Sequence, residues 1–367
     1  MQPIRKIAIS TGGGDAPGLN AVIRAVVLAA QQRDWECWGI REGYNGLMMP
    51  EEFPEGGLIH LTRAAVAGIA HLGGTMLGTT NRGNPLQYPV TRADGTIFEV
   101  DRGDELVQKF RDAGFDALIT VGGDGSLSIA HQLANRGLRV VGVPKTIDND
   151  LEGTFMTFGF DTAVSFATEC LDRLHTTATS HRRIMVVEVM GRYAGWIGLH
   201  AGIAGNADVV LIPEIPYHIE RVAEFVRGRE RRGRACTVVV VAEGAKAVNG
   251  SVSVLGKATG QAEKLGGVGE KLARELQERT GKEARTVVLG HLLRGGSPTS
   301  FDRLVALRFG AAAVRALEEG RSAVMVSLRP PTVCYEPLKT AIQRMKMVSL
   351  DSDTVATARD LGICFGD

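Results

Sequence analysis

The sequence predicts an α/β protein in which mostly parallel sheets are covered by helices on both faces. Three observations lead to this prediction. Short, continuously apolar, β-branched runs alternate with longer segments of helical periodicity. Each run ends in a turn rich in glycine or charge, and glycine makes up 46 of the 367 residues, well above its usual share of about 7%. Strands that are apolar at every position are buried on both faces, as in parallel sheets between helix layers.

Composition excludes several other classes of protein. A chain of 367 residues is long enough for two domains or one large domain. Hydrophobic residues make up 44% and charged residues 23%, as in ordinary globular proteins, and a net charge of +1 disfavours a nucleic-acid partner. The five cysteines form no C-x-x-C pair, which argues against a disulfide framework or a zinc site. No apolar run reaches signal-peptide length or the ~20 residues of a membrane helix, so we expect a cytoplasmic protein without a membrane partner.

The first predicted strand, residues 7–9, runs into a glycine turn. Residues 12–14 are all glycine, and a largely apolar helix pattern follows over residues 21–30, with Pro17 near its first turn. Consecutive unobstructed backbone N–H groups at a helix start suit a phosphate. The turn does not match G-x-x-x-x-G-K-[S/T], so it is not the usual P-loop, and a tight turn without a ligand is the alternative.

The predicted strand over residues 117–121 ends in Gly122-Gly123-Asp124-Gly125-Ser126. A carboxylate there can hold Mg²⁺ against phosphate oxygens, because Mg²⁺ usually takes one or two carboxylates plus phosphates and waters. The flanking glycines let phosphates approach the main chain. The alternative is a structural turn in which Asp124 caps the next helix.

The strand over residues 140–143 ends in Pro144-Lys145-Thr146-Ile147-Asp148-Asn149-Asp150. In an extended segment, Asp148 and Asp150 would point to the same side. One carboxylate could then act as general base on a hydroxyl while the other assists a metal or positions water. Each acid taken alone also fits an ordinary turn.

Cationic residues lie near the ends of two later predicted strands, over residues 184–190 and 286–289. They are Arg183, Arg192, Arg285 and Arg294, with His291 close to the last. Guanidinium groups bind a sugar phosphate through paired hydrogen bonds. For any single arginine a surface salt bridge is the better explanation, and a structural role explains His291 equally well, so the prediction depends on the set.

Two segments interrupt the alternation of strands and helices. Residues 81–104 and 245–267 are expected to be loops or hairpins, the first with two short β-like pieces around Asp94-Gly95. The arginine-rich stretch over residues 221–234 is interpreted as a solvated helix face rather than an anion patch.

These motifs together resemble the phosphofructokinase family. The matching segments are in the family's order over most of residues 5–315, and they are residues 13–20, 122–126, 144–150, 190–192, 243–244 and 290–296. The resemblance implies the phosphofructokinase fold, with two Rossmann-like three-layer α/β domains. Residues 1–160 plus 294–343 would bind the nucleotide, and residues 161–293 plus 344–367 would bind fructose 6-phosphate.

The resemblance also implies a reaction, in which the γ-phosphoryl group of MgATP is transferred to the 1-hydroxyl of D-fructose 6-phosphate, giving fructose 1,6-bisphosphate and ADP in glycolysis. Asp148 matches the general base, Asp124 the Mg²⁺ ligand, Asp150 a second acid and Arg192 a further catalytic residue. Thr146 matches a position that helps hold the transferred phosphoryl group.

The resemblance also implies binding contacts. Positions that match nucleotide contacts are Gly13, Tyr44, Arg82, Gly123, Asp124, Gly125 and Ser126. Positions that match sugar contacts are Thr146, Ile147, Asp148, Met190, Gly191, Arg192, Glu243, His291, Leu292, Leu293 and Arg294. Arg183 and Arg285 match two arginines that reach the sugar phosphate from a neighbouring subunit, which implies an active site shared within a homotetramer.

Two positions bear on the phosphoryl donor. Gly125 resembles the small residue of ATP-dependent members, whereas pyrophosphate-dependent members carry Asp there, which would crowd and repel an α-phosphate. Lys145 resembles the pyrophosphate-dependent type. We give Gly125 more weight, because a lysine is compatible with a triphosphate. We therefore expect ATP as the donor, with a pyrophosphate-dependent fructose 6-phosphate 1-phosphotransferase as the alternative.

Other functions fit the sequence less well. The opening glycine turn suggests a dinucleotide-binding oxidoreductase, but its G-x-G-x-x-G spacing is poor. A kinase acting on NAD or a lipid would share the Gly-Gly-Asp-Gly turn and lack the other segments. A catalytically inactive subunit would be expected to lose Asp124 or Asp148, and both are present.

Overall fold

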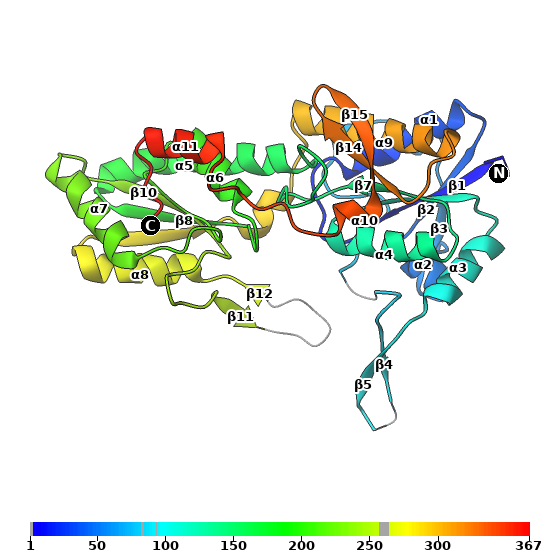
Figure 1. Ribbon diagram of the computed structural model, residues 1–367, viewed down its shortest axis with the longest axis horizontal. Coiled ribbons are helices and arrows are strands. Elements are labelled where there is room, and N and C mark those ends of the chain that lie inside the picture. Colours follow the sequence, from blue (N-terminus) through cyan, green and yellow to red (C-terminus); the bar gives the residue numbers. More distant parts are fainter. Residues whose placement is uncertain (1–2, 82–83, 93, 257–263) are drawn as a thin grey trace. The chain divides into compact units, whose positions relative to one another are not determined.

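A computed structural model describes residues 3–81, 84–92, 94–256 and 264–367 (Figure 1). The chain divides into two compact units. The first unit comprises Met1–Thr146, Leu151–Gly159 and Arg294–Met345, and the second comprises Ile147–Asp150, Phe160–Leu293 and Lys346–Asp367. These bounds differ from the expected ones at three places: residues 147–150 and Phe160 group with the second unit, and residues 344–345 group with the first.

Among the described residues, seven strands form the sheet of the first unit, in the order β15-β14-β7-β6-β1-β2-β3. The strands are β1 (Lys6–Thr11), β2 (Glu36–Ile40), β3 (Leu58–His60), β6 (Ala117–Gly122), β7 (Val140–Pro144), β14 (Val324–Arg329) and β15 (Thr332–Pro337). The strands from β14 to β2 pair in parallel, and β3 and β15 add antiparallel edges. The predicted mostly parallel sheet is confirmed, and the carboxyl ends of β1, β6 and β7 lie side by side.

Helices cover both faces of this sheet (Figure 1). The helices of the first unit are α1 (Leu19–Gln31), α2 (Asn45–Met48), η1 (Pro50–Glu52), η2 (Ile69–His71), α3 (Gly103–Asp112), α4 (Asp124–Asn135), α9 (Ser300–Glu318) and α10 (Leu338–Ala341). Side chains alternate along each strand between two cores. Ile7 and Ile9 of β1 enter the core with α1 and α9, whereas Ala8 enters the core with α3 and α4. Continuous apolar strands are thus explained by a helix layer on each side.

Helices α1 and α9 approach closely because Gly310 faces α1. A Cβ atom at Gly310 would lie 2.7 Å from the Val22 carbonyl oxygen, so a larger residue would push the helices apart. Helix α1 begins at Leu19 after Gly18, which is the N-cap residue with a φ of 111°. Pro17 therefore lies two residues before the helix, near its first turn, as the sequence predicted.

The first interrupting segment contains a β-hairpin. Strands β4 (Tyr88–Thr91) and β5 (Ile97–Val100) pair antiparallel, which confirms the two predicted β-like pieces. The Asp94 carboxylate accepts hydrogen bonds from the Thr96 amide and hydroxyl, at 2.9 and 2.6 Å, and so shapes the turn. In the second segment, β11 (Val254–Gly256) pairs with β12 (Lys264–Leu265), and residues 257–263 lie outside the described residues.

The second unit is built on a smaller parallel sheet, with the strand order β13-β8-β10-β9. Its strands are β8 (Ile184–Val189), β9 (Val209–Leu211), β10 (Thr237–Ala242) and β13 (Ala284–Val288). Helices α5 (Phe160–His181), α6 (Trp196–Ala204) and α11 (Asp353–Asp360) lie on one face, and α7 (Ile219–Arg231) and α8 (Val268–Thr280) on the other (Figure 1). The short helix η3 covers Gly290–Arg294.

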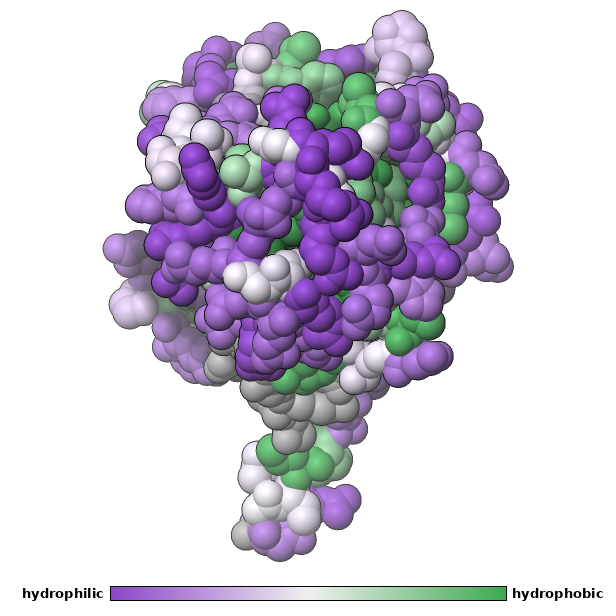
Figure 2. Space-filling model, turned by 90° about the vertical axis from the view of Figure 1, so that its left-hand side faces the viewer, coloured by the Kyte–Doolittle hydropathy of each residue, from purple (hydrophilic) through white to green (hydrophobic). Residues whose placement is uncertain are grey.

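The outer surface of the second unit is mostly hydrophilic on the side shown in Figure 2. In the arginine-rich stretch, Arg221, Arg231, Arg232 and Arg234 are exposed, as expected for a solvated helix face. Arg229 instead pairs with Asp208 at 2.7 Å, and Arg227 donates to the Arg279 carbonyl at 2.9 Å. No helix among the described residues is both long and apolar enough to cross a membrane.

Candidate active site

The glycine turn after β1 is held by backbone hydrogen bonds. Gly12 N–H donates to the Val121 carbonyl at 3.0 Å, and Gly13 N–H donates to the Thr80 carbonyl at 3.1 Å. The expectation of a run of amides available to a phosphate is therefore wrong for these two residues. Gly13 has a φ of 77°, in the left-handed region that favours glycine.

Two cationic side chains lie against this turn within the first unit. Lys145 is 3% exposed, and its Nζ donates a hydrogen bond to the Gly14 carbonyl. The Arg294 guanidinium donates to the Asp15 carbonyl at 3.1 Å. It also lies 2.8 Å from the place where a Cβ of Gly14 would be, so a larger residue at position 14 would have to displace the guanidinium. These cations supply the positive charge that an anion at the turn requires.

The second glycine turn begins α4. Gly123 is the N-cap residue and Asp124 is the first residue of the helix, so the structure excludes the alternative in which Asp124 is the N-cap. Asp124 is exposed. The Ser126 hydroxyl lies 2.7 Å from the place where a Cβ of Gly12 would be, so the two glycine turns are in contact.

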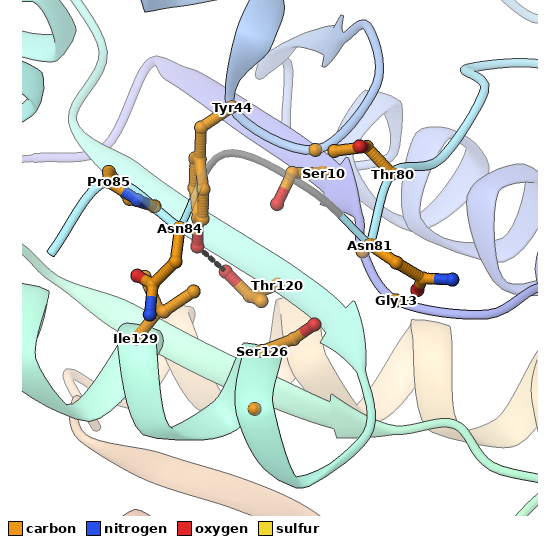
Figure 3. Close-up of a pocket in the computed structure, with 13 residues that line it drawn as sticks. Ser10, Gly13, Tyr44, Thr80, Asn81, Asn84, Pro85, Thr120, Ser126 and Ile129 are labelled. Atoms are coloured by element: carbon orange, nitrogen blue, oxygen red, sulfur yellow. Dashed lines mark hydrogen bonds between the residues drawn. The ribbon is translucent and has the colours of Figure 1, made fainter. Parts of the chain in front are cut away.

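A cavity of about 290 Å³ opens beside these turns in the first unit (Figure 3). It is lined by Ser10, Gly12, Gly13, Gly43, Tyr44, Thr80, Asn81, Asn84, Pro85, Thr120, Gly125, Ser126 and Ile129. Asn84, Gly125 and Ile129 also line an adjoining cavity of about 440 Å³ over the outer face of α4. The space is of the size found for small-molecule ligands, with a polar end at the glycine turns and an apolar end at Pro85 and Ile129.

Three hydroxyl groups meet in the cavity wall. The Tyr44 hydroxyl lies 3.0 Å from that of Thr120, with Ser10 beside them (Figure 3). Burial raises the pKa of Tyr44, and hydrogen bonds with Thr120 and Ser10 offset only part of that rise.

Of the residues named from the sequence, Gly13, Tyr44, Gly125 and Ser126 line the cavity. Ser10, Thr120, Asn84 and Ile129 were missed, and the one available signal was a hydroxyl residue within the apolar strands β1 and β6.

The acidic segment after β7 is not extended. Asn149 has a φ of 52°, and its side-chain oxygen accepts a hydrogen bond from Lys346 Nζ at 3.2 Å. The premise that Asp148 and Asp150 lie in an extended segment and so point to the same side is therefore wrong, because a left-handed residue separates them. Both acids are half-buried. The Ile147 side chain is 0% exposed, so only its backbone can contact a ligand.

In the second unit, three of the segments that resemble the family, at residues 190–192, 243–244 and 290–293, follow the carboxyl ends of β8, β10 and β13. Glu243 N–H donates to the Val189 carbonyl at 2.9 Å, and Gly244 N–H to the Gly191 carbonyl at 3.1 Å. Leu289 N–H donates to the Glu188 carbonyl at 3.0 Å. Met190, Gly191, Arg192, Glu243, His291 and Leu292 therefore belong to one edge of the sheet.

The side chains at this edge differ in accessibility. Arg192 is half-buried, and its guanidinium lies 5.2 Å from the ring centre of Tyr193. His291 and Leu292 are exposed. The Leu293 side chain is 1% exposed and cannot contact a ligand, which leaves only its backbone for the role expected from the sequence.

Arg183 and Arg285 lie at the opposite edge, because they stand at the amino ends of β8 and β13. Arg183 Nε donates to Glu283 Oε2 at 2.6 Å, and Arg285 also pairs with Glu283. Arg183 precedes a six-residue strand that Met190 follows. At about 3.3 Å per residue, roughly 20 Å separate the two edges, so one small sugar cannot contact both in the same chain.

Arg82 lies outside the described residues. Among the described residues, no group of three or more His, Cys, Asp or Glu side chains could hold a metal ion. A metal that is bound mainly by protein side chains is therefore not supported in that part of the chain. One exposed carboxylate beside two glycine turns fits an ion that is held largely by phosphates and water.

Comparisons with known proteins agree on one family. The profile described as "Phosphofructokinase" matches residues 6–317. An "ATP-dependent 6-phosphofructokinase" of Chloroflexus aggregans is 50% identical over 99% of this chain and 98% of its own length. A "Pyrophosphate--fructose 6-phosphate 1-phosphotransferase" of Streptomyces coelicolor is 45% identical over 98% of this chain and 100% of its own.

Solved structures show the same fold. Pichia pastoris phosphofructokinase aligns with a TM-score of 0.79 and 31% identity, over 99% of this chain and 37% of that one. A pyrophosphate-dependent phosphofructokinase from Nitrosospira multiformis aligns with a TM-score of 0.80 and 22% identity, over 97% of this chain and 91% of that one. The two-unit α/β architecture is therefore the one these proteins share.

Proposed function

This chain belongs to the phosphofructokinase family, and we propose that it is an ATP-dependent 6-phosphofructokinase. It would transfer the γ-phosphoryl group of MgATP to the 1-hydroxyl of D-fructose 6-phosphate. Relatives named for either donor are of similar identity, 50% for ATP and 45% for pyrophosphate, so the choice of donor needs support from the site itself. The proposed setting is glycolysis in the cytoplasm.

The observation that carries the choice of ATP is the open space at Gly125. A Cβ atom there would meet no described atom within 4 Å, and Gly125 lines both adjoining cavities. Neither packing nor a positive φ calls for glycine at this helical position, and glycine in a helix costs about 0.5–1 kcal/mol relative to alanine. Its absence of a side chain is best explained by a ligand that fills this space. The nucleoside part of ATP needs such space and pyrophosphate does not.

Lys145 is compatible with either donor. Its buried ammonium group lies against the glycine turn, where both donors would place a phosphate. The cation therefore supports binding of a phosphorylated donor without selecting one. Pyrophosphate remains the alternative donor.

Asp124 is the proposed ligand for the Mg²⁺ of the donor. When bound, the ion neutralises charge on the transferring phosphates. Asp148 would accept the proton of the 1-hydroxyl, with Asp150 as the second acid and Thr146 holding the transferred group. Carboxylates fit these roles because phosphoryl transfer depends mainly on positioning and charge stabilisation.

Fructose 6-phosphate is proposed to bind at the carboxyl edge of the second unit's sheet, near Met190, Gly191, Arg192, Glu243 and His291. Arg294 is a further candidate for contact with the sugar. The roughly 20 Å between the two edges supports contributions of Arg183 and Arg285 to the site of a neighbouring subunit. We therefore propose a homo-oligomer, and a homotetramer by likeness to the family.

A donor assay tests the proposal. Purified protein is supplied with fructose 6-phosphate and Mg²⁺, and with either ATP or pyrophosphate, and fructose 1,6-bisphosphate is measured directly. We expect turnover with ATP that exceeds turnover with pyrophosphate. Turnover with pyrophosphate and none with ATP would replace the proposal by the alternative, and turnover with neither would remove both.

A further inference from the structure

Glu283 is an acidic residue between two of the arginines assigned to the sugar phosphate. One carboxylate oxygen accepts from Arg183 Nε at 2.6 Å, and the other pairs with Arg285 Nη2. Each arginine thus binds a different oxygen of the same carboxylate. The arrangement lies wholly within the second unit.

The register of β13 on β8 produces this arrangement. Ala284 pairs with Ile184, and Ile184 N–H donates to the Glu283 carbonyl at 3.0 Å. Glu283 therefore stands beside Arg183 across the strand pair. Glu283 and Arg285 are two residues apart, so they share a face of the strand. Strand pairing brings all three charged groups together, with Glu283 in the middle.

The carboxylate uses only part of each guanidinium. An arginine has five N–H donors in a fixed fork, and one ion pair leaves the other donors of Arg183 and Arg285 available to an anion. The Arg183 and Arg285 side chains are 28% and 59% exposed, and the neighbouring His181 and Arg182 are exposed too. This edge of the sheet therefore has an excess of positive charge. The Glu283 carboxylate orients the guanidinium groups of Arg183 and Arg285.

Without this carboxylate, the two long side chains would be free to sample many rotamers. Binding a phosphate would then have to order both. Hydrogen bonding to Arg183 lowers the pKa of Glu283, so its charged form is the one that holds the arginines at neutral pH.

We propose that Glu283 is a positioning residue, which orients Arg183 and Arg285 to receive the 6-phosphate of the sugar bound by a neighbouring copy of the chain. The inference depends on the proposed function, because it takes the sugar phosphate as the ligand of the two arginines. Glu283 itself does not contact the substrate. It acts by preorganising the two cations.

The experiment compares Glu283→Gln and Glu283→Asp with the full-length wild-type protein. We expect Glu283→Gln to raise KM for fructose 6-phosphate about 10-fold, the loss expected for one charge-assisted hydrogen bond, while kcat and the KM for the donor stay within about twofold. Glu283→Asp keeps the charge and should recover part of the loss. Glu220→Gln is the matched control, because Glu220 also pairs with an arginine, Arg279, at 2.7 Å in the same unit. It should change none of these constants.

Direct binding of fructose 6-phosphate, measured by calorimetry without a donor, separates this inference from the proposed function. If wild type binds the sugar phosphate but does not turn over with ATP, the function fails and the Glu283 variants still test the inference by their Kd. An unchanged Kd and KM in Glu283→Gln overturn the inference. A lower KM overturns it too, since Glu283 would then compete with the phosphate. Equal loss of kcat and of affinity for both substrates would show a merely structural role and overturn it as well.

Discussion

The hydroxyl groups of Tyr44 and Thr120 lie 3.0 Å apart, although the two residues belong to different parts of the first unit. Thr120 comes from the buried strand β6, and Tyr44 from the N-terminal side of α2. Their hydrogen bond fixes one wall of the proposed donor cavity. It also satisfies two hydroxyl groups that burial would otherwise penalise.

Replacement of Tyr44 by Phe should leave the Thr120 hydroxyl without this partner. We expect a loss of about 1 kcal/mol in the free energy of unfolding, measured by urea denaturation. Thr120→Val should cost a similar amount, and the double variant less than the sum, because both changes remove the same bond. Additive losses would contradict a direct interaction.

A side chain at Gly125 should act on the donor and leave the fold intact. Gly125→Asp is expected to lower kcat/KM for ATP by about 100-fold or more, since it places a carboxylate at the phosphate-binding turn, where like charges repel at low dielectric. Gly125→Ala is the matched control. Its methyl group meets no described atom of the protein within 4 Å and should raise stability by about 0.5–1 kcal/mol, and because it is small and uncharged it should weaken the use of ATP far less than Gly125→Asp does. If Gly125→Asp kept the wild-type turnover with ATP, the proposal that ATP occupies the space beside Gly125 would be contradicted.

A shared active site predicts complementation between inactive variants. Asp148→Ser should lower kcat by about 10²–10⁴-fold, the usual contribution of a general base, and leave sugar binding largely intact. Arg285→Ala should weaken binding of fructose 6-phosphate. When the two variants are unfolded together and refolded, hybrids should regain turnover, because some sites combine an intact Asp148 with an intact Arg285 from the partner. Mixing without refolding is the control, and hybrids without activity would contradict a site shared between subunits.

Glu214 makes stability depend on pH in the second unit. Its carboxylate accepts from Gly195 N–H at 3.0 Å and Val348 N–H at 2.9 Å, and burial raises its pKa above the usual 4.5 despite these bonds. The folded protein then holds the proton more tightly than the unfolded chain. The contribution of Glu214 to stability is therefore largest below pH 4.5 and falls as pH rises through the folded pKa.

Glu214→Gln should remove this part of the pH dependence. Urea denaturation between pH 4 and 7 is the measurement, with Glu224→Gln on the exposed face of α7 as the control. Parallel curves for wild type and Glu214→Gln would contradict the raised pKa.

The strands could be predicted from the sequence because both faces of each sheet are covered. Residues such as Ile7, Ala8 and Ile9 are then apolar without alternation, which is a strong local signal. The turns after those strands could be predicted for the same reason, since the carboxyl ends of parallel strands share one edge.

The directions of individual side chains could not be predicted in this way. Motif matching assigned Ile147 and Leu293 to the sugar site, but their side chains are buried in the structure. Asparagine tolerates the left-handed conformation that Asn149 adopts, but it adopts other conformations as well, so the spacing of Asp148 and Asp150 was taken as that of a strand. Ser10 and Thr120 were missed because a buried hydroxyl and a ligand-facing hydroxyl look alike in sequence.

The hairpin of β4 and β5 is closed at its base, where Arg102 N–H donates to the Pro85 carbonyl at 2.7 Å. The chain therefore leaves the scaffold and rejoins it at almost the same place. Removal or lengthening of residues 88–100 would alter an appendage and spare the central sheet. Insertions or deletions in this hairpin, including an engineered reporter peptide, should therefore cost little folding free energy.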